Sequence, residues 1–173
     1  MKLLCSFEGP DMTGKTQIAK ELSRQMNVPY FKNSGEWSVQ LKDTNYFKNL
    51  LVFGGTFLVD FIDQVRPDVI LDRHYPSEWV YSKVFGRETD EEVLRKIDVK
   101  FAEAGGRIII CRRKSYKGIK DDLHDDVDSK VLEQIDSVYG DFVRWTRCQV
   151  LTLWVDDQDL AREIEEVKSW LGN

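Results

Sequence analysis

The loop Gly9-Pro10-Asp11-Met12-Thr13-Gly14-Lys15-Thr16 constrains this chain more than any other feature of its sequence. It follows an apolar run at residues 2–7 and opens a helical pattern at residues 13–26. Glycines at this spacing let backbone N–H groups converge on phosphate oxygens, and the start of a helix adds partial positive charge. A Gly-x4-Gly-Lys-Thr motif between a strand and a helix is typical of a phosphate-binding loop. The chain is therefore predicted to bind a nucleoside triphosphate.

Individual residues of the loop have expected tasks. Lys15 supplies a point charge for the β- and γ-phosphates, and the Thr16 hydroxyl is a ligand for Mg2+. A second metal ligand is expected at Asp72, where an apolar strand ends in a carboxylate about 60 residues after the loop. The predicted ATP-binding residues are Gly9, Asp11, Met12, Thr13, Gly14, Lys15, Thr16 and Gln17.

Short apolar runs alternate with longer helical patterns along the whole chain. The predicted strands are 2–7, 28–31, 68–72, 107–111 and 150–155. Helices are predicted at residues 13–26, 76–85, 128–147 and 157–171. One or two more are expected within 37–65, with a break at Gly54-Gly55. Another is expected to begin at a capping box of Thr89 and Glu92 and to stop at Gly105.

This alternation favours the α/β class, because strands separated by helices form parallel sheets. We expect a P-loop NTPase-type three-layer sandwich, with a five-stranded parallel sheet, helices on both faces and a short lid. No linker or repeat divides the sequence, so residues 1–173 are expected to form one P-loop domain, with the lid at about 112–127. Ligands of such sheets bind at the carboxyl ends of the strands.

Charge and cysteine content disfavour several classes of protein. A net charge of −5 and a pI of about 5.2 argue against non-specific binding to nucleic acid, which needs clustered Lys and Arg. The apolar runs are too short for a membrane span or a signal peptide. Cys5, Cys111 and Cys148 fit neither a disulfide framework nor a zinc site, and the first two are expected to be inert core thiols. These features predict a protein of the reducing cytoplasm.

Two stretches resemble the thymidylate kinase family of nucleoside monophosphate kinases. The loop FEGPDMTGKTQ, residues 7–17, has an aspartate at Asp11, as that family does. The stretch ILDRHYPSEWVY carries the family's strand-end Asp-Arg-aromatic pattern, here Asp72-Arg73-His74, and its following serine, Ser77. The order of elements agrees over most of the chain. The resemblance implies Mg2+–ATP-dependent phosphorylation of a deoxynucleoside monophosphate such as dTMP, and the small, divergent chain suggests a viral or phage source.

The same resemblance implies which residues bind the sugar and phosphate of the acceptor. Asp11 would accept a hydrogen bond from the 3′-hydroxyl of deoxyribose. Arg73 would hold the acceptor's phosphate, because a guanidinium fork suits that group. Lys32 stands where the family has a second arginine, so it keeps the charge and loses the bidentate contact. A solvated surface lysine is the alternative for Lys32.

Three aromatic residues complete the acceptor site that the resemblance implies. Phe53 would stack on the base, and Tyr81 would lie beneath the sugar and exclude a 2′-hydroxyl. Phe57 stands where the family often has an arginine that hydrogen-bonds to the edge of the base. A phenylalanine cannot make that hydrogen bond, so the identity of the base stays open. All three also fit helical core patterns. His74 is expected to be a packing residue.

The run CRRKSYKGIK, residues 111–120, is exceptional in an acidic chain. Family members that lack a loop arginine supply this cation from a mobile lid, and here Met12 stands at the loop position. Arg112 and Arg113 are therefore predicted to stabilise charge on the transferring phosphoryl group, alongside the catalytic residues Lys15, Asp72 and Arg73. The alternative is a solvated, ion-paired loop.

Other functions stay open on this sequence. A deoxynucleoside kinase would need a carboxylate base near the end of the second strand, for which Glu36 is a candidate. The acidic composition counts against a kinase that acts on nucleic acid. The intact Lys15, Thr16 and Asp72 argue against a purely regulatory nucleotide-binding module. The resemblance also suggests a homodimer formed through the helices after the second strand.

Overall fold

The computed structural model describes residues 3–32, 47–119 and 128–172. Within these residues, a sheet of five parallel strands has the order β2-β3-β1-β4-β5. The strands are β1 Leu4–Glu8, β2 Tyr30–Lys32, β3 Val69–Asp72, β4 Arg107–Arg112 and β5 Gln149–Trp154. This confirms the predicted parallel sheet, with each strand within two residues of its expected bounds. Glu36 and residues 37–46 and 120–127, which include much of the predicted lid, lie outside the described residues.

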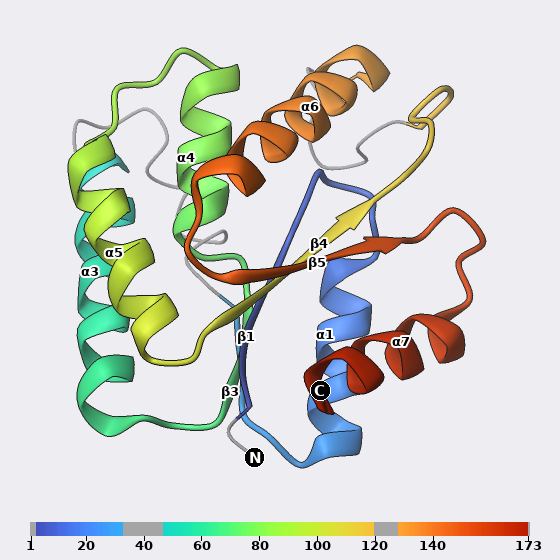
Figure 1. Cartoon of the computed structure of the whole chain (residues 1–173). Helices are drawn as coiled ribbons and strands as arrows, with labels where there is room; N and C mark the ends of the chain where they lie inside the picture. Colours follow the sequence, from blue (N-terminus) through green and yellow to red (C-terminus); the bar gives the residue numbers. More distant parts are fainter. Residues whose placement is uncertain (1–2, 33–46, 120–127, 173) are drawn as a thin grey trace.

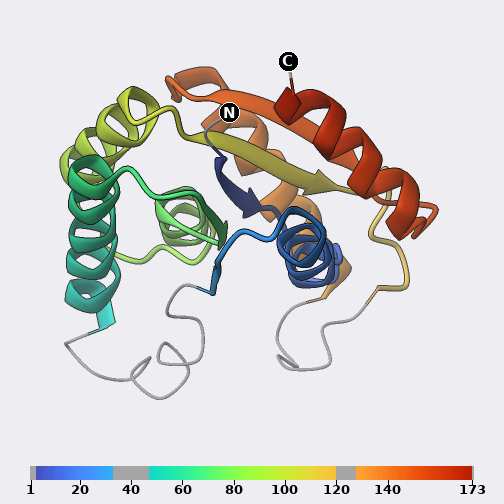
Figure 2. The same ribbon diagram turned by 90° about the horizontal axis from the view of Figure 1, so that it is seen from below.

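Helices cover both faces of the sheet (Figure 1). They are α1 Lys15–Met26, α3 Phe47–Val65, α4 Tyr75–Val84, α5 Glu91–Glu103, α6 Ser129–Trp145 and α7 Leu160–Gly172. The views in Figure 1 and Figure 2 both place α3 beside α5, and α1 beside α7. The expected three-layer sandwich is therefore confirmed. No helix among the described residues is both long and apolar enough to cross a membrane.

Two apolar clusters hold the layers together. Side chains alternate along a strand, so Ile108 and Ile109 of β4 enter opposite clusters. Ile109 packs in the cluster that joins the sheet to α1 and α7, and Ile108 in the one that joins it to α3, α4, α5 and α6. Full burial of one such side chain contributes about 1.5–3 kcal/mol. The two-sided burial explains why the central strands are largely apolar between their ends.

The register of the strands decides which residues share the carboxyl edge of the sheet. Lys32 of β2 pairs with Asp72 of β3, and Asp72 pairs with Phe7 of β1. The next residue of β1 is Glu8, and the phosphate-binding loop follows at once. The side chains at the ends of β1, β2 and β3 therefore meet beside the loop.

The predicted break at Gly54-Gly55 is wrong, because α3 continues through both glycines. A Cβ atom at Gly55 would lie 3.4 Å from Ile97 Cδ1 of α5, an ordinary van der Waals distance, so α5 packs directly over this part of α3. Each helical glycine costs about 1 kcal/mol of helix propensity relative to alanine. Packing against α5 offsets that loss, which a sequence pattern does not reveal.

The start of α5 also differs from its prediction, whereas its end agrees. Asp90 is the N-cap, and its carboxylate accepts from Val93 N at 3.1 Å, so the capping box at Thr89 is wrong by one residue. Gly105 follows the helix with φ +83°, and the Gly106 N–H donates to Phe101 O at 2.8 Å. This left-handed glycine stop is as the sequence predicts.

Candidate active site

The phosphate-binding loop depends on two glycines for different reasons. Gly9 has φ +127°, and a Cβ there would lie 2.2 Å from Cys111 O, so the backbone passes directly against the end of β4. Gly14 has φ +71° and is the N-cap of α1 without a side-chain hydrogen bond. The first N–H groups of α1 therefore have no side-chain cap, as an anion-binding helix start requires.

Lys15 lies buried inside the loop. Its Nζ donates to Pro10 O and, at 3.2 Å, to Thr13 Oγ1, while Thr13 Oγ1 donates to Pro10 O at 2.8 Å. Burial and the charge of Arg73 lower the pKa of Lys15 to about 8, although Asp11 opposes that change. The ammonium group is thus held by the loop itself, ready for an anionic ligand.

Thr16 and Asp72 come together as the metal prediction requires. Thr16 Oγ1 donates to Asp72 Oδ2 at 2.6 Å, and the Asp72 side chain is buried beside the loop. Tyr30 at the start of β2, which the sequence argument did not identify, donates its hydroxyl to the same oxygen at 2.7 Å. Hydroxyl and carboxylate oxygens this close fit the preference of Mg2+ for hard oxygen ligands.

Asp11 turns its carboxylate toward the end of β3 and the helix that follows. Arg73 Nη2 donates to Asp11 Oδ1, and the Tyr81 hydroxyl donates to Asp11 Oδ2 at 2.8 Å. Burial alone would raise the pKa of Asp11, but the charges of Arg73 and Lys15, with these hydrogen bonds, lower it to about 2. Asp11 is therefore ionised and tied to residues outside the loop.

Arg73 is the centre of this cluster. Its Nη1 donates to Gly9 O at 3.1 Å and Ser77 Oγ at 3.0 Å, and its Nη2 donates to Asp11 and, at 3.0 Å, to Tyr81 Oη. Four of the five guanidinium N–H groups are thus engaged within the protein. The backbone at Arg73 has φ +68°, which costs a non-glycine residue roughly 1–2 kcal/mol.

The two arginines at the end of β4 have different surroundings. Arg113 Nε donates to Met12 O of the loop at 3.1 Å. Arg112 instead donates to the Asp136 carboxylate of α6 with both Nε and Nη2, and its guanidinium lies over the Trp154 ring at 5.6 Å. The structure therefore places only Arg113 of this pair in hydrogen-bond contact with the loop.

Some of the other residues that the sequence assigns to the acceptor site lie in the described part of the chain, and some do not. Lys32 is the last residue of β2, and it is exposed. In the register of the sheet it lies opposite Asp72 of β3. Phe57 lies on α3 and is 76% exposed, whereas the side chain of Phe53 lies outside the described residues. His74 is buried against Tyr75 and Phe101, and burial lowers the pKa of its ring to about 4.

Sequence reasoning missed the carboxylate of Glu8. It is 0% exposed at the end of β1, and burial raises its pKa, while hydrogen bonds from Ser6 and Ser77 oppose that rise. The signal was present, since an apolar strand that ends in an acid had already singled out Asp72. Tyr139 of α6, which contacts Ser77 Oγ at 2.9 Å, gave no such signal.

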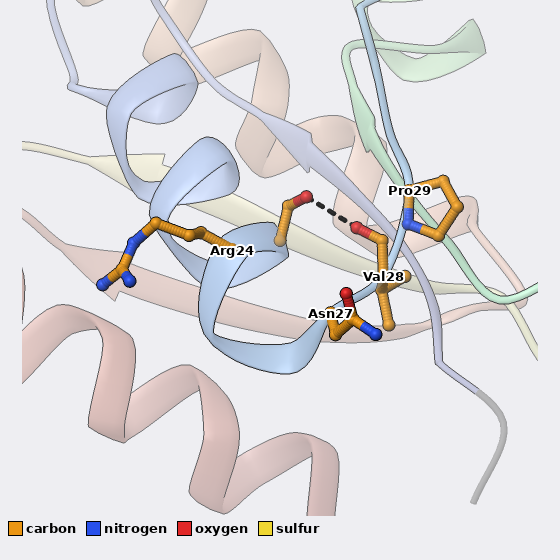
Figure 3. Close-up of a pocket in the computed structure, with 5 residues that line it drawn as sticks. Arg24, Asn27, Val28 and Pro29 are labelled. Carbon is orange, nitrogen blue, oxygen red and sulfur yellow. Dashed lines mark hydrogen bonds between the residues drawn. The ribbon is translucent and has the colours of Figure 1, made fainter.

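An open depression of about 460 Å³ lies far along α1 from the loop (Figure 3). It is lined by Ser23, Arg24, Asn27, Val28 and Pro29, and Ser23 Oγ donates to Val28 O at 2.6 Å. Because α1 leads from the loop to the start of β2, this depression belongs to the amino edge of the sheet. It takes no part in the site at the carboxyl edge.

Three solved structures are similar to this chain in fold, and two of them are named as kinases. The YorR protein from Bacillus subtilis, crystallised in complex with phosphorylated GDP, has a TM-score of 0.70 at 22% identity, over 98% of each chain. Thymidylate kinase from Ehrlichia chaffeensis has 0.62 at 18% identity, over 98% of each chain. Deoxyadenosine kinase from M. mycoides has 0.60 at 17% identity, over 98% of this chain and 99% of that one. No family model and no curated protein sequence matches the chain.

These likenesses define the class of the fold. The α/β sandwich, with its strand order and its loop after β1, is the P-loop NTPase-type fold that the sequence predicts.

Proposed function

We propose that this protein is a P-loop kinase that transfers the γ-phosphoryl group of ATP, with Mg2+, to a deoxynucleoside monophosphate such as dTMP. One observation carries the proposal: Asp11, inside the phosphate-binding loop, is bound by Arg73 and Tyr81 from the next strand end and helix. Groups suited to a sugar hydroxyl and an acceptor phosphate thus adjoin groups suited to ATP. The resemblance to thymidylate kinases in these two stretches supports the same function.

The reaction needs positioning and charge stabilisation and no strong base, because an acceptor phosphate is already ionised near neutral pH. Lys15 and the N–H groups at the start of α1 would bind the phosphates of ATP. Thr16 and Asp72 would hold Mg2+, which when bound neutralises charge on the β- and γ-phosphate oxygens. Arg113 would supply the cation that Met12 cannot.

The contacts of Arg73 refine its proposed role. With four N–H groups engaged, it can grip an acceptor phosphate with two of them only by releasing a protein partner. Asp11 is also the residue that would accept a hydrogen bond from the 3′-hydroxyl. Binding of the sugar and binding of the phosphate would therefore both change the contact between Arg73 and Asp11. Tyr81, whose hydroxyl donates to Asp11 Oδ2 at 2.8 Å, would exclude a 2′-hydroxyl.

A deoxynucleoside kinase is the second candidate. The fold likeness to deoxyadenosine kinase from M. mycoides favours it. Its acceptor is a hydroxyl, so a carboxylate base would be required, and the candidate Glu36 lies outside the described residues.

ADP formation from ATP, measured across a panel of deoxynucleoside monophosphates, deoxynucleosides, ribonucleotides and short DNA, tests these proposals. Turnover with monophosphates is expected. Turnover with deoxynucleosides alone would promote the second candidate. The absence of ADP with every acceptor would refute the kinase proposal.

Asp11→Asn is expected to raise the KM for a 2′-deoxy acceptor by about 10- to 100-fold, because a charged hydrogen-bond acceptor is lost. The Kd of ATP should change by less than about threefold. A 2′,3′-dideoxy acceptor, which lacks the hydroxyl, should show a much smaller difference between the two proteins. Steady-state kinetics and calorimetry of ATP binding measure these effects, and equal losses in both would contradict the role given to Asp11.

We also propose that the protein forms a homodimer through α3. Phe57, Phe61 and Val65 recur every four residues on α3 and are 76%, 45% and 57% exposed. The helix ends at Val65, just before β3 begins, so Phe61 and Val65 lie toward the amino edge, away from the loop. An exposed apolar stripe of this kind suits a two-fold contact with a second copy.

Phe61→Glu is expected to weaken self-association by about 100-fold or more, because two carboxylates would be buried across a two-fold axis. Val143→Glu, on the 39% exposed surface of α6, is the matched control and should leave association unchanged. Sedimentation at several concentrations measures both. A wild-type protein that stays monomeric, or a dimeric Phe61→Glu variant, would show that the α3 contact is wrong.

A further inference from the structure

Glu8 carries a buried carboxyl group that the phosphate-binding motif does not explain. It ends β1 directly before Gly9 and is 0% exposed. Three donors surround its carboxylate: Ser6 Oγ, the His74 N–H at 2.7 Å and Ser77 Oγ at 2.6 Å. A carboxylate so fully hydrogen-bonded in the interior has a specific structural task.

One of these donors, the His74 N–H, belongs to the turn that presents Arg73. The Arg73 N–H donates to Phe7 O at 3.0 Å, and the following His74 N–H donates to Glu8. His74 is the N-cap of α4 and makes no side-chain cap of its own. In a capping box, an acidic side chain of the first helical turn accepts from the N–H of the N-cap residue. Here Glu8, from a neighbouring strand, accepts from that N–H instead. The left-handed backbone at Arg73 is held on both sides by β1.

The third donor connects Glu8 to the guanidinium group. Ser77 has one hydroxyl hydrogen, which it donates to Glu8, so its oxygen is left to accept from Arg73 Nη1 at 3.0 Å. Tyr139 of α6 contacts the same oxygen at 2.9 Å. Arg73 Nη2 then reaches Asp11 and Tyr81. A continuous chain of hydrogen bonds runs from Glu8 to the carboxylate assigned to the acceptor.

We propose that Glu8 is a positioning residue of the acceptor site, which holds Arg73 in place through Ser77 and the His74 backbone. The proposal rests on the proposed kinase function for its catalytic consequence. Its structural content, the placement of the Arg73 guanidinium, stands on the contacts alone. On this proposal Glu8 acts through Arg73 and would not itself contact ATP or the acceptor.

Glu8→Gln is the sharpest test, because it keeps the size of the side chain and replaces one acceptor oxygen by an amide group. The KM of the acceptor is expected to rise by about 10- to 100-fold, while the Kd of ATP changes less than about threefold. Ser77→Ala should act in the same direction. The double variant should lose little more than the worse single one, since both substitutions break one chain of contacts.

Asp98 provides a matched control. It is a buried carboxylate on α5 that accepts from the Tyr75 hydroxyl at 2.6 Å, Thr146 Oγ1 and the Arg147 N–H at 2.9 Å, remote from the loop in these contacts. Asp98→Asn makes the same chemical change and is expected to lower the melting temperature without raising the acceptor KM. A rise in acceptor KM for Asp98→Asn equal to that for Glu8→Gln would overturn the specific role of Glu8.

A measurement without substrate separates this inference from the proposed function. In protein labelled with 15N-arginine, the guanidinium signals of Arg73, assigned with Arg73→Lys, should be slowly exchanging in the wild type. They should broaden or exchange faster in Glu8→Gln. Unchanged signals would overturn the inference whatever the enzyme does, whereas a wild type without any ADP formation would refute only the kinase proposal.

Discussion

Lys15→Ala is expected to lower kcat for ADP formation by about 10³-fold, the largest effect of a single substitution in this site. The ammonium group lies inside the phosphate-binding loop, held by Pro10 O and Thr13 Oγ1. Removing it takes away a charge that counts most when negative charge builds up on the transferring group. The Kd of ATP should weaken by less than kcat falls.

Stability should not explain this loss. Burial lowers the pKa of Lys15 to about 8, which means that the folded protein disfavours its charge. The alanine variant should therefore melt at the same temperature as the wild type or higher. Lys96→Ala, an exposed lysine paired with Glu92 on α5, is the control and should leave kcat unchanged. A fall in kcat of less than tenfold for Lys15→Ala would contradict the proposed phosphoryl transfer.

Arg113→Ala is expected to lower kcat by about 10²- to 10³-fold with little change in stability. Its Nε already contacts Met12 O, so its charge lies at the loop position where Met12 provides none. Single-turnover kinetics isolate the chemical step from product release. Near-normal turnover in this variant would contradict the assignment of Arg113.

Arg112→Ala should behave differently, which makes the neighbouring residue the matched comparison. Its guanidinium is bound by Asp136, so its loss should destabilise the fold by about 1–3 kcal/mol and reduce kcat far less. Chemical denaturation measures the first effect. Equal kinetic losses in the two variants would show that both arginines act in transfer, as the sequence predicts.

Met12→Arg provides a rescue experiment. The Met12 side chain is 41% exposed at the loop, so an arginine fits there without entering the core. Added to Arg113→Ala, it should restore at least tenfold of the lost kcat if the loop lacks only a cation. Failure of the rescue, with ATP binding intact, would mean that the position of the charge matters more than its presence.

Much of the fold was predictable because its signals are local. An apolar run bounded by polar residues indicates a buried strand, and the glycine stop at Gly105 requires only its own left-handed backbone. Two predictions failed for different reasons. The helix α3 continues through Gly55, where the neighbouring helix α5 packs over it, whereas the N-cap of α5 differs only locally, with Asp90 in place of Thr89.

The sequence by itself determined the phosphate-binding loop, its lysine and the strand-end Asp72, because each depends on residue types at fixed short spacing. Only the tertiary structure decided that Asp11 faces Arg73, 62 residues away, that Arg113 reaches the loop across 101 residues, and that Glu8 meets Ser77 across 69. The register of a parallel sheet creates these contacts, since it brings distant strand ends to one edge. The spacing of residues along the chain does not indicate which of these side chains face one another.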